Sequence, residues 1–237
     1  MLGKLYIMGV GPGDPKLLTI KAYEILQKAD VVAIPYSKHD KDSVAFNIVK
    51  EYVPPHCQIL SLLLPMTHNQ DLLKKAWQEA AAQVAASLKN GLDAVFITIG
   101  DPAIYSTGMY IYQELKNLIP ELECETVPGI TSFTASAASL NLPLALGTEP
   151  LLVVPHVVSK ERLKSILAEY PNVVLLKVTA NFQEIVTCLE ETGLLNKAVF
   201  VSRCGQAGEF ISFNLKSLDP QSLDYLSLVI IRKGGVL

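Results

Sequence analysis

Short runs of apolar residues recur along the chain, and each ends close to a glycine or a proline or at a polar turn. In the first half they lie at residues 5–10, 31–34 and 94–99. Continuous apolar runs bounded by turn residues are typical of strands buried on both faces of a parallel sheet. Between these runs lie amphipathic segments, such as residues 69–91, which have apolar residues at helical spacing. The alternation of the two patterns predicts an α/β fold.

The second half continues the pattern but ends in strands with short connections. Apolar runs lie at residues 151–154, 173–176, 198–202, 210–213 and 226–231. We therefore predict two α/β domains, the first with a parallel sheet and the second with a mixed sheet. The expected boundary falls near residues 118–124, which gives domains of residues 1–120 and 121–237.

Several element ends can also be predicted from local residues. Asn69 should cap a long helix that closes at residues 90–91, and the strand at residues 31–34 should stop at Pro35. A helix is expected over residues 105–118. Asn181 and Glu184 resemble a capping box for a helix that runs to about residue 191.

Composition excludes several classes of protein. The mean hydropathy of +0.31 is high, yet every apolar run is far shorter than the ~20 residues that a membrane-spanning helix needs. The net charge is −3 and no long basic run occurs, so we expect no nucleic-acid partner. The N-terminus does not resemble a signal peptide, which points to a cytoplasmic protein.

Cysteine and histidine spacing predicts no metal site. The cysteines form no CxxC pair, so they should be reduced and structural. The histidines are scattered and form no HExxH motif, and we therefore expect no protein-bound metal.

Two glycine-rich turns stand where strands end, which is where ligands bind in open α/β sheets. The first, at residues 9–14, does not complete the dinucleotide motif GxGxxG, because Asp14 stands at the last glycine position. Pro12 also removes an N–H group that could bind pyrophosphate. An acidic turn suits a positively charged ligand such as a sulfonium, although an ordinary tight turn would look the same. The second turn is at residues 100–102, where Asp101 could also be only a turn residue. Thr131 and Ser132 open a later helix, where they could cap it or contact an adenosine.

Together these segments resemble the tetrapyrrole methylase family, the class III methyltransferases that use S-adenosylmethionine (SAM). The matching runs are residues 9–15 (GVGPGDP), 100–102 (GDP) and 127–132 (VPGITS), in the family's order, and the resemblance spans nearly the whole chain. Residues 29–35, 42–45, 100–107 and 135–144 resemble one branch, the C20-methyltransferases of precorrin-2 or cobalt-factor II.

The resemblance implies a homodimeric enzyme of cobalamin and porphyrin biosynthesis, with two α/β domains and SAM folded in a cleft between them. The product of the cofactor would be S-adenosylhomocysteine. It implies that the cofactor-binding residues are Pro12, Gly100, Asp101, Ile104, Tyr105, Thr131, Ser132, Lys177, Cys204 and Gly205. Relatives often have methionine near position 177, where this chain has Lys177.

Methyl transfer from a sulfonium is an in-line displacement, for which the enzyme must position the reactants and exclude water. The nucleophile would be the meso carbon C20, which loses a proton afterwards. Tyr105 and Asp101 are candidate catalytic residues, and Glu149 and His156 are further candidate bases. The carboxylates of the substrate could be bound by the side chains of Lys38, Lys41 and Arg203, which could equally be solvated surface charges.

Other functions remain open from the sequence. Within the family, the chain could methylate another tetrapyrrole carbon, as in uroporphyrinogen III at C2/C7 or precorrin-4 at C11. Relatives that act on ribosomal RNA or diphthamide intermediates share the fold, but the acidic charge balance argues against RNA. A nucleotide-binding oxidoreductase or a non-catalytic tetrapyrrole carrier are alternatives from other classes. Whether the substrate contains cobalt stays open at this point.

Overall fold

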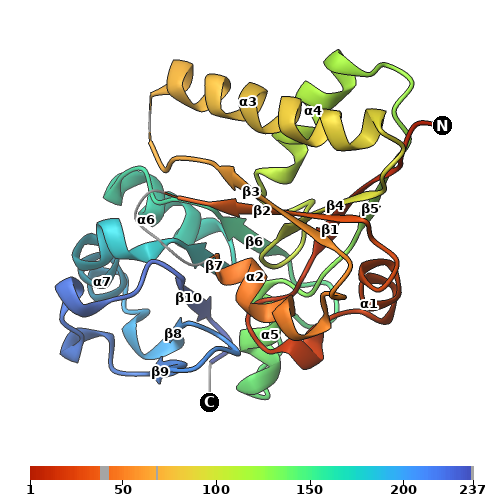
Figure 1. Cartoon of the computed structure of the whole chain (residues 1–237). Coiled ribbons are helices and arrows are strands. Elements are labelled where there is room, and N and C mark those ends of the chain that lie inside the picture. Colours follow the sequence, from red (N-terminus) through yellow and green to blue (C-terminus); the bar gives the residue numbers. More distant parts are fainter. Residues whose placement is uncertain (38–42, 68, 236–237) are drawn as a thin grey trace. The chain divides into compact units, whose positions relative to one another are not determined.

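The computed structural model describes residues 1–37, 43–67 and 69–235. It divides into two compact units, Met1–Thr131 and Ser132–Leu237. Each unit contains a five-stranded sheet and its own helices, as the colours along the chain show in Figure 1. The two predicted α/β folds are therefore confirmed.

The sheet of unit 1 is entirely parallel, with the strand order β3-β2-β4-β1-β5. Its strands are β1 (Leu5–Gly9), β2 (Val31–Tyr36), β3 (Gln58–Leu63), β4 (Ala94–Thr98) and β5 (Cys124–Val127). The central strands β1 and β4 are almost completely buried, which explains why they have continuous apolar sequences. Strand β1 lies between β4 and β5, so the turns that follow these three strands are neighbours.

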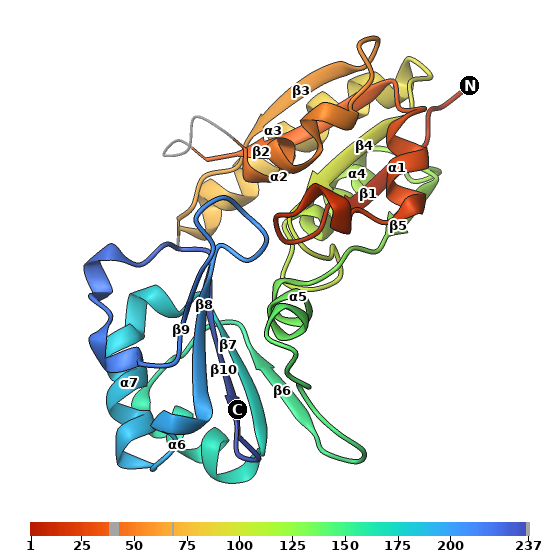
Figure 2. The same cartoon turned by 90° about the horizontal axis from the view of Figure 1, so that it is seen from below.

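Helices cover both faces of this sheet (Figures 1 and 2). Helices α3 (Gln70–Lys89) and α4 (Gly108–Leu118) bury their apolar sides on one face. Helices α1 (Ile20–Leu26) and α2 (Val44–Val49) cover the other face. The result is a three-layer α/β/α unit in which only the ends of the strands are left for a ligand.

The sheet of unit 2 is mixed, as predicted, with the strand order β6-β7-β10-β8-β9. Its strands are β6 (Leu151–Val154), β7 (Asn172–Leu176), β8 (Ala198–Ser202), β9 (Phe210–Ser212) and β10 (Ser227–Arg232). Strand β10 is antiparallel to both of its neighbours, β7 and β8, so these two strands run in the same direction.

Helices α6 (Lys160–Glu169) and α7 (Phe182–Glu191) pack together on one face of this second sheet (Figure 2). Phe182 and Phe200 meet edge to face within that core, with ring centroids 5.5 Å apart. Helix α5 (Ser132–Ser139) is the first element of unit 2. Short 3-10 helices lie at Pro15–Leu17, Lys50–Tyr52, Val178–Asn181, Leu195–Lys197, Leu215–Ser217 and Pro220–Ser222.

Most predicted element ends are confirmed, but three differ. The side chain of Asn69 caps α3 as expected, by accepting hydrogen bonds from two backbone N–H groups of the first turn. Strand β2 continues through Pro35, because at that point it pairs only with β3 and needs no second row of N–H donors. The predicted capping box at Asn181 is wrong, since its side-chain amide donates to the carbonyl of Val157 instead.

The third difference concerns α4, which begins at Gly108 and not near residue 105. A Cβ atom at Gly108 would lie 2.7 Å from Cγ2 of Ile7, so a glycine at this position allows the first turn of the helix to lie close against β1. The two compact units meet at Thr131 and Ser132, and the domains of residues 1–120 and 121–237 stay a prediction. Strand β5 belongs to unit 1 because it pairs with β1.

Candidate functional site

Three turns meet at the carboxyl edge of the first sheet. They follow β1, β4 and β5, which are adjacent strands, and they comprise residues 9–14, 99–105 and 128–131. The first two turns are joined by a pair of backbone hydrogen bonds between Gly11 and Gly100, with N···O distances of 3.3 and 2.9 Å. The sequence motifs of the three turns are thus brought together in space.

Glycine is required in this cluster because backbone atoms pack against backbone atoms. A Cβ atom on Gly129 would lie 2.2 Å from the carbonyl oxygen of Gly100, and one on Gly9 would lie 2.5 Å from the same oxygen. Gly11 and Gly100 also have φ values of +79° and +71°, which side chains disfavour. Any larger residue at Gly9 or Gly129 would therefore push the turns apart. We call Gly9, Gly11, Gly100 and Gly129 the glycine cluster.

Asp101 connects the second and third turns. One carboxylate oxygen accepts a hydrogen bond from the N–H of Ala103 at 2.8 Å, and the other accepts from the N–H of Gly129 at 2.9 Å. Bonds from N–H groups to a charged acceptor are stronger than neutral ones. Asp101 therefore holds the turns in place, and its predicted contact with a cofactor and its predicted catalytic role stay predictions.

The electrostatic character of the turns is acidic. Residues 9–14, 99–105 and 128–131 contain Asp14 and Asp101 but no lysine or arginine. The carboxylate of Asp14 accepts from the N–H of Lys16 at 2.9 Å and so caps the following 3-10 helix, while Pro12 is buried behind it. Two carboxylates without a basic side chain suit a ligand with a positive centre and not a pyrophosphate.

Tyr105 occupies an unusual position on the turn after β4. Its φ is +52°, a left-handed conformation that costs a non-glycine residue about 1–2 kcal/mol. Tyr105 is 54% exposed and Ile104 is 42% exposed. Strain of this kind is concentrated at functional sites, which supports the prediction that this turn contacts a ligand.

The remaining predicted cofactor residues divide between the two units. Thr131 ends unit 1, and Ser132 starts α5 in unit 2. Lys177 directly follows β7 and is exposed, whereas Cys204 follows β8 and is buried. Burial raises the pKa of the Cys204 thiol, so it stays protonated and is not a nucleophile.

Gly205 lies next to Cys204, in the loop between β8 and β9. Its φ is +72°, and its N–H donates to the carboxylate of Glu209. This contact therefore fixes the turn that contains Cys204 and Gly205, which are predicted cofactor-binding residues.

The two further candidate bases lie at opposite ends of the second sheet. Glu149 precedes β6, and the N–H of Leu146 and the amide of Asn172 lower the pKa of its carboxyl group. A carboxylate that is stabilised in this way is a poor base. His156 is exposed and follows β6, at the carboxyl edge. Lys38 and Lys41 lie outside the described residues.

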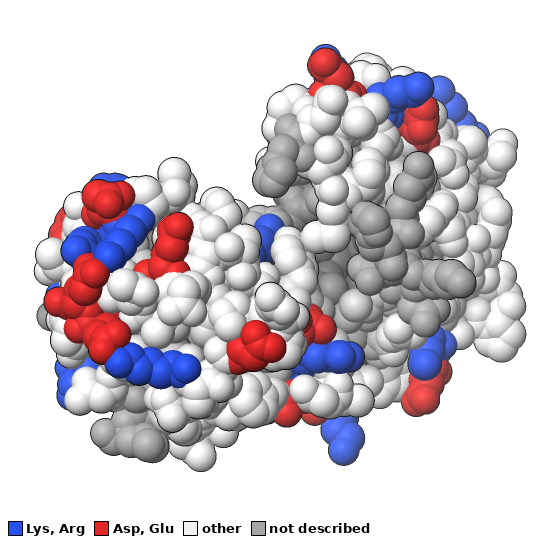
Figure 3. Space-filling view, turned by 90° about the vertical axis from the view of Figure 1, so that its left-hand side faces the viewer, with Lys and Arg blue, Asp and Glu red and all other residues white. Residues whose placement is uncertain are grey.

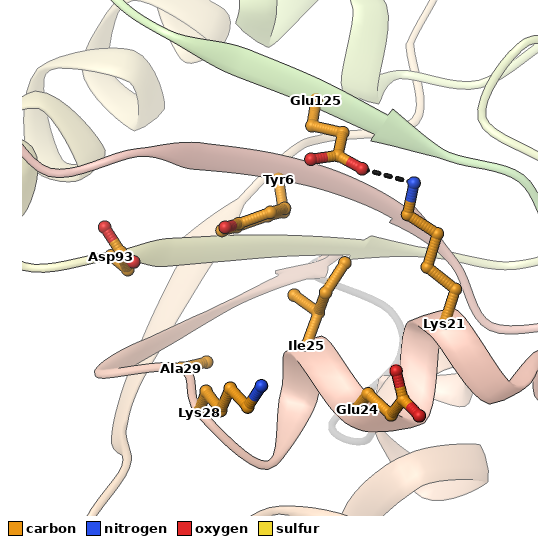
Figure 4. Close-up of a pocket in the computed structure, with 8 residues that line it drawn as sticks. All are labelled: Tyr6, Lys21, Glu24, Ile25, Lys28, Ala29, Asp93 and Glu125. Carbon is orange, nitrogen blue, oxygen red and sulfur yellow. Dashed lines mark ion pairs between the residues drawn. The ribbon is translucent and has the colours of Figure 1, made fainter.

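A separate hollow lies toward the amino ends of the strands of the first sheet. Its volume is about 290 Å³, and Figure 4 shows its lining: Tyr6, Lys21, Glu24, Ile25, Lys28, Ala29, Asp93 and Glu125. Glu125 forms ion pairs with Lys21 and Lys4, at 2.5 and 2.7 Å, which lower the pKa of its carboxyl group to about 2. Glu125 and Lys21 are already paired with each other, and the glycine cluster lies at the opposite edge of the sheet, so this hollow is not the predicted cofactor site.

The surface shows no large area of one charge on the face drawn in Figure 3, where acidic and basic side chains lie in small mixed groups. Among the helices of the described residues, none is long and apolar enough to cross a membrane. Within residues 1–37, 43–67 and 69–235, no three histidine, cysteine, aspartate or glutamate side chains are placed to hold a metal ion.

Sequence reasoning missed two features of this region. The motifs contain Gly9 and Gly129 but do not reveal their contacts with Gly100, because packing between distant turns has no local signal. It also missed Asp224, whose carboxylate lies 3.7 Å from the guanidinium of Arg203.

Comparison with known proteins gives consistent results. A family model described as Tetrapyrrole (Corrin/Porphyrin) Methylases matches residues 4–219. The chain is 37% identical to a probable cobalt-precorrin-2 C(20)-methyltransferase of Methanocaldococcus jannaschii, covering 98% of this chain and 97% of that protein. It is 32% identical to the cobalt-precorrin-2 C(20)-methyltransferase of Salmonella typhimurium, covering 98% of both chains.

A solved structure has the same fold. The uroporphyrin-III C-methyl transferase of Thermus thermophilus, in complex with S-adenosyl homocysteine, matches with a TM-score of 0.69 at 22% identity. The match covers 98% of this chain and 92% of that one.

Proposed function

Because the chain belongs to the tetrapyrrole methylase family, we propose that it transfers a methyl group from SAM to C20 of precorrin-2 in its cobalt form. The observation that carries the proposal is the near full-length match to two cobalt-precorrin-2 C20-methyltransferases, at 37% and 32% identity. The predicted homodimer, cytoplasmic location and role in cobalamin and wider porphyrin biosynthesis belong to the same proposal.

The glycine cluster fits SAM on chemical grounds. The three turns provide glycine backbone and two carboxylates, with no basic side chain. SAM would supply an activated methyl group on a positively charged sulfur and would leave as S-adenosylhomocysteine. In this proposal Pro12, Gly100, Asp101, Ile104, Tyr105, Thr131, Ser132, Lys177, Cys204 and Gly205 bind it.

The residues of the chain contribute to the reaction mainly by holding the reactants in position. The bridge between Gly11 and Gly100 and the contacts of Asp101 fix the three turns before a ligand arrives. A prearranged site holds the methyl group and the nucleophile close together, which can contribute several kcal/mol to a rate. The meso carbon of the tetrapyrrole brings its own reactivity through conjugation with the ring nitrogens.

The proton that leaves C20 needs an acceptor. Tyr105 and Asp101 were the predicted candidates, and of these the side chain of Tyr105 is the more exposed. Asp101 is already engaged by two N–H groups. We propose that the hydroxyl of Tyr105 relays this proton, because its oxygen can accept the proton from C20 while its own proton passes to solvent. Tyr105→Phe, which keeps the ring, should lower kcat while leaving the Kd of SAM unchanged.

The direct test is an anaerobic incubation with SAM and either cobalt-precorrin-2 or metal-free precorrin-2, followed by mass spectrometry and NMR of the labelled product. We expect one added methyl group, on C20, and faster turnover of the cobalt form. A methyl on another carbon would retain the family's chemistry but refute the C20 assignment. Absence of product together with absence of SAM binding in calorimetry would favour a non-catalytic tetrapyrrole carrier.

A further inference from the structure

The turn after β4 is tied to the first sheet by a side-chain hydrogen bond that lies outside the glycine cluster. The hydroxyl of Ser106 donates to the hydroxyl oxygen of Thr98 at 3.0 Å, and its own oxygen accepts from the N–H of Gly108 at 3.0 Å. Thr98 is the last residue of β4, and Gly108 is the first residue of α4. One side chain therefore joins the end of the strand to the start of the helix.

Thr98 is a rigid anchor for this contact. It is 8% exposed, and it lies opposite Gly9 in the pairing of β4 with β1. Its carbonyl also accepts a hydrogen bond from the N–H of Val10 at 2.9 Å. A group on a paired, buried strand is held more precisely than a group on a loop. The turn is thus fastened to the buried centre of the first sheet.

Capping of α4 does not by itself explain this arrangement. Thr107 stands at the position that normally caps the helix, yet its side chain makes no capping hydrogen bond. Ser106 supplies the acceptor instead, one position earlier in the chain. A capping residue only needs to accept from the helix, whereas the hydroxyl of Ser106 also donates to Thr98, eight residues away. This second bond adds nothing to the cap, so it acts on the turn itself.

Tyr105, which directly precedes Ser106, needs support from its neighbours. Its φ of +52° is unfavourable for tyrosine, and it is 54% exposed, so burial of its ring does not hold this conformation. Strained backbone persists only where the surrounding structure fixes it. On the other side of the turn, Asp101 accepts from the N–H groups of Ala103 and Gly129. Tyr105 therefore lies between two anchors, Asp101 before it and Ser106 after it.

We propose that Ser106 is a positioning residue, which through its bond to Thr98 keeps Tyr105 in the left-handed conformation from which the tyrosine hydroxyl relays the proton of C20. This inference rests on the proposed function and adds to it a residue outside the predicted site. The contacts of the glycine cluster and of Asp101 hold the start of the turn independently. Loss of the Ser106 hydroxyl should therefore lower kcat while SAM still binds.

The test measures kcat and KM of the full-length protein with Ser106→Ala, Thr98→Val or Thr98→Ser. Valine keeps the shape of threonine but removes the acceptor, whereas serine retains the hydroxyl. We expect Ser106→Ala and Thr98→Val each to lower kcat about 10-fold to 100-fold, the effect of misplacing a reacting group by up to about 1 Å. Thr98→Ser should restore the wild-type kcat. The Kd of SAM, measured by calorimetry, should change less than about twofold in all three variants.

Two matched controls separate positioning from stability. Thr107→Ala removes the neighbouring hydroxyl, which makes no capping bond, and should leave kcat unchanged. Ser159 caps α6 in unit 2 by accepting from the N–H of Arg162, so Ser159→Ala should lower the unfolding midpoint and leave kcat unchanged. If Ser106→Ala behaves like Ser159→Ala, the serine only stabilises the fold and the positioning role is refuted.

A double-mutant cycle tests whether Ser106 acts through Tyr105. Tyr105→Phe removes the hydroxyl that is to be positioned, so the addition of Ser106→Ala should lower kcat by less than about a further twofold. Losses that multiply instead would overturn the inference, because Ser106 would then act on another part of the site.

A spectroscopic readout does not depend on turnover. In protein labelled with fluorotyrosine, Tyr105 gives the fluorine NMR signal that is missing from Tyr105→Phe. We expect Ser106→Ala and Thr98→Val to shift this signal and Thr107→Ala to leave it in place. If the wild type transfers no methyl group, the proposed function fails, yet the shift still decides whether Ser106 positions Tyr105. An unchanged Tyr105 signal in Ser106→Ala overturns the inference.

Discussion

Substitution of Gly129 by alanine should damage cofactor binding more than it damages the fold. The new Cβ atom would lie 2.2 Å from the carbonyl oxygen of Gly100 and 2.9 Å from the Cα atom of Gly9. A carbon–oxygen contact needs about 3.3 Å, so the turns must separate by about 1 Å. The bridge between Gly11 and Gly100 uses the same carbonyl and would be disturbed.

Two magnitudes follow from this displacement. Overpacking of backbone against backbone costs about 1–3 kcal/mol of unfolding free energy. A shift of about 1 Å in a binding group can reduce catalysis about 100-fold. We therefore expect Gly129→Ala to weaken SAM binding by up to about 100-fold in calorimetry, at a temperature where circular dichroism shows the variant folded.

The chain offers a matched control at the opposite edge of the same sheet. A Cβ atom at Gly3 would lie 2.0 Å from the carbonyl oxygen of Leu92, a clash of the same kind before β1 and β4 begin. Gly3→Ala should lower the unfolding midpoint by a similar amount but leave the Kd of SAM unchanged. Wild-type SAM affinity in Gly129→Ala, or equal losses in both variants, would refute the assignment of the cofactor to the glycine cluster.

Three other substitutions test separate parts of the molecule. Asp101→Asn removes one of the two carboxylate oxygens that hold the turns, so stability should fall by about 1.5 kcal/mol and SAM should bind more weakly, as measured by urea unfolding and calorimetry. Glu125 pairs with Lys21, and its folded pKa of about 2 lies below the ordinary 4.5. The pair therefore stabilises the fold above about pH 5, and this contribution is lost as the pH falls toward 2. Glu125→Gln should flatten that part of a pH–stability profile and change nothing in SAM binding. Lys177→Gly relieves left-handed strain and should raise Tm by about 1–4 °C in calorimetric scans.

Much of the fold could be predicted from local patterns. The buried strands β1 and β4 have almost no polar residues, and the long helix α3 begins at a good cap and ends at a glycine. Such signals depend on neighbouring residues only, and therefore they can be recognised without knowledge of the tertiary structure. The prediction of a parallel sheet followed by a mixed sheet came from the length of the connections, which is also local.

The errors arose where distant residues decide the outcome. Pro35 stays in β2 because only β3 pairs with the strand at that point. A short stretch of sequence cannot show which strands pair there. Asn181 donates to Val157, so a tertiary contact overrides the local capping pattern.

The candidate site shows the same distinction in its chemistry. Motifs identified the three turns, but only the structure shows that Gly9, Gly100 and Gly129 touch and that Asp101 holds two turns together. Left-handed backbone at a lysine cannot be read from sequence either, because lysine does not favour it. The conformation of Lys177 is set by its surroundings, where its N–H donates to the carbonyl of Ser227 at the start of β10, and no pattern of neighbouring residues predicts that contact.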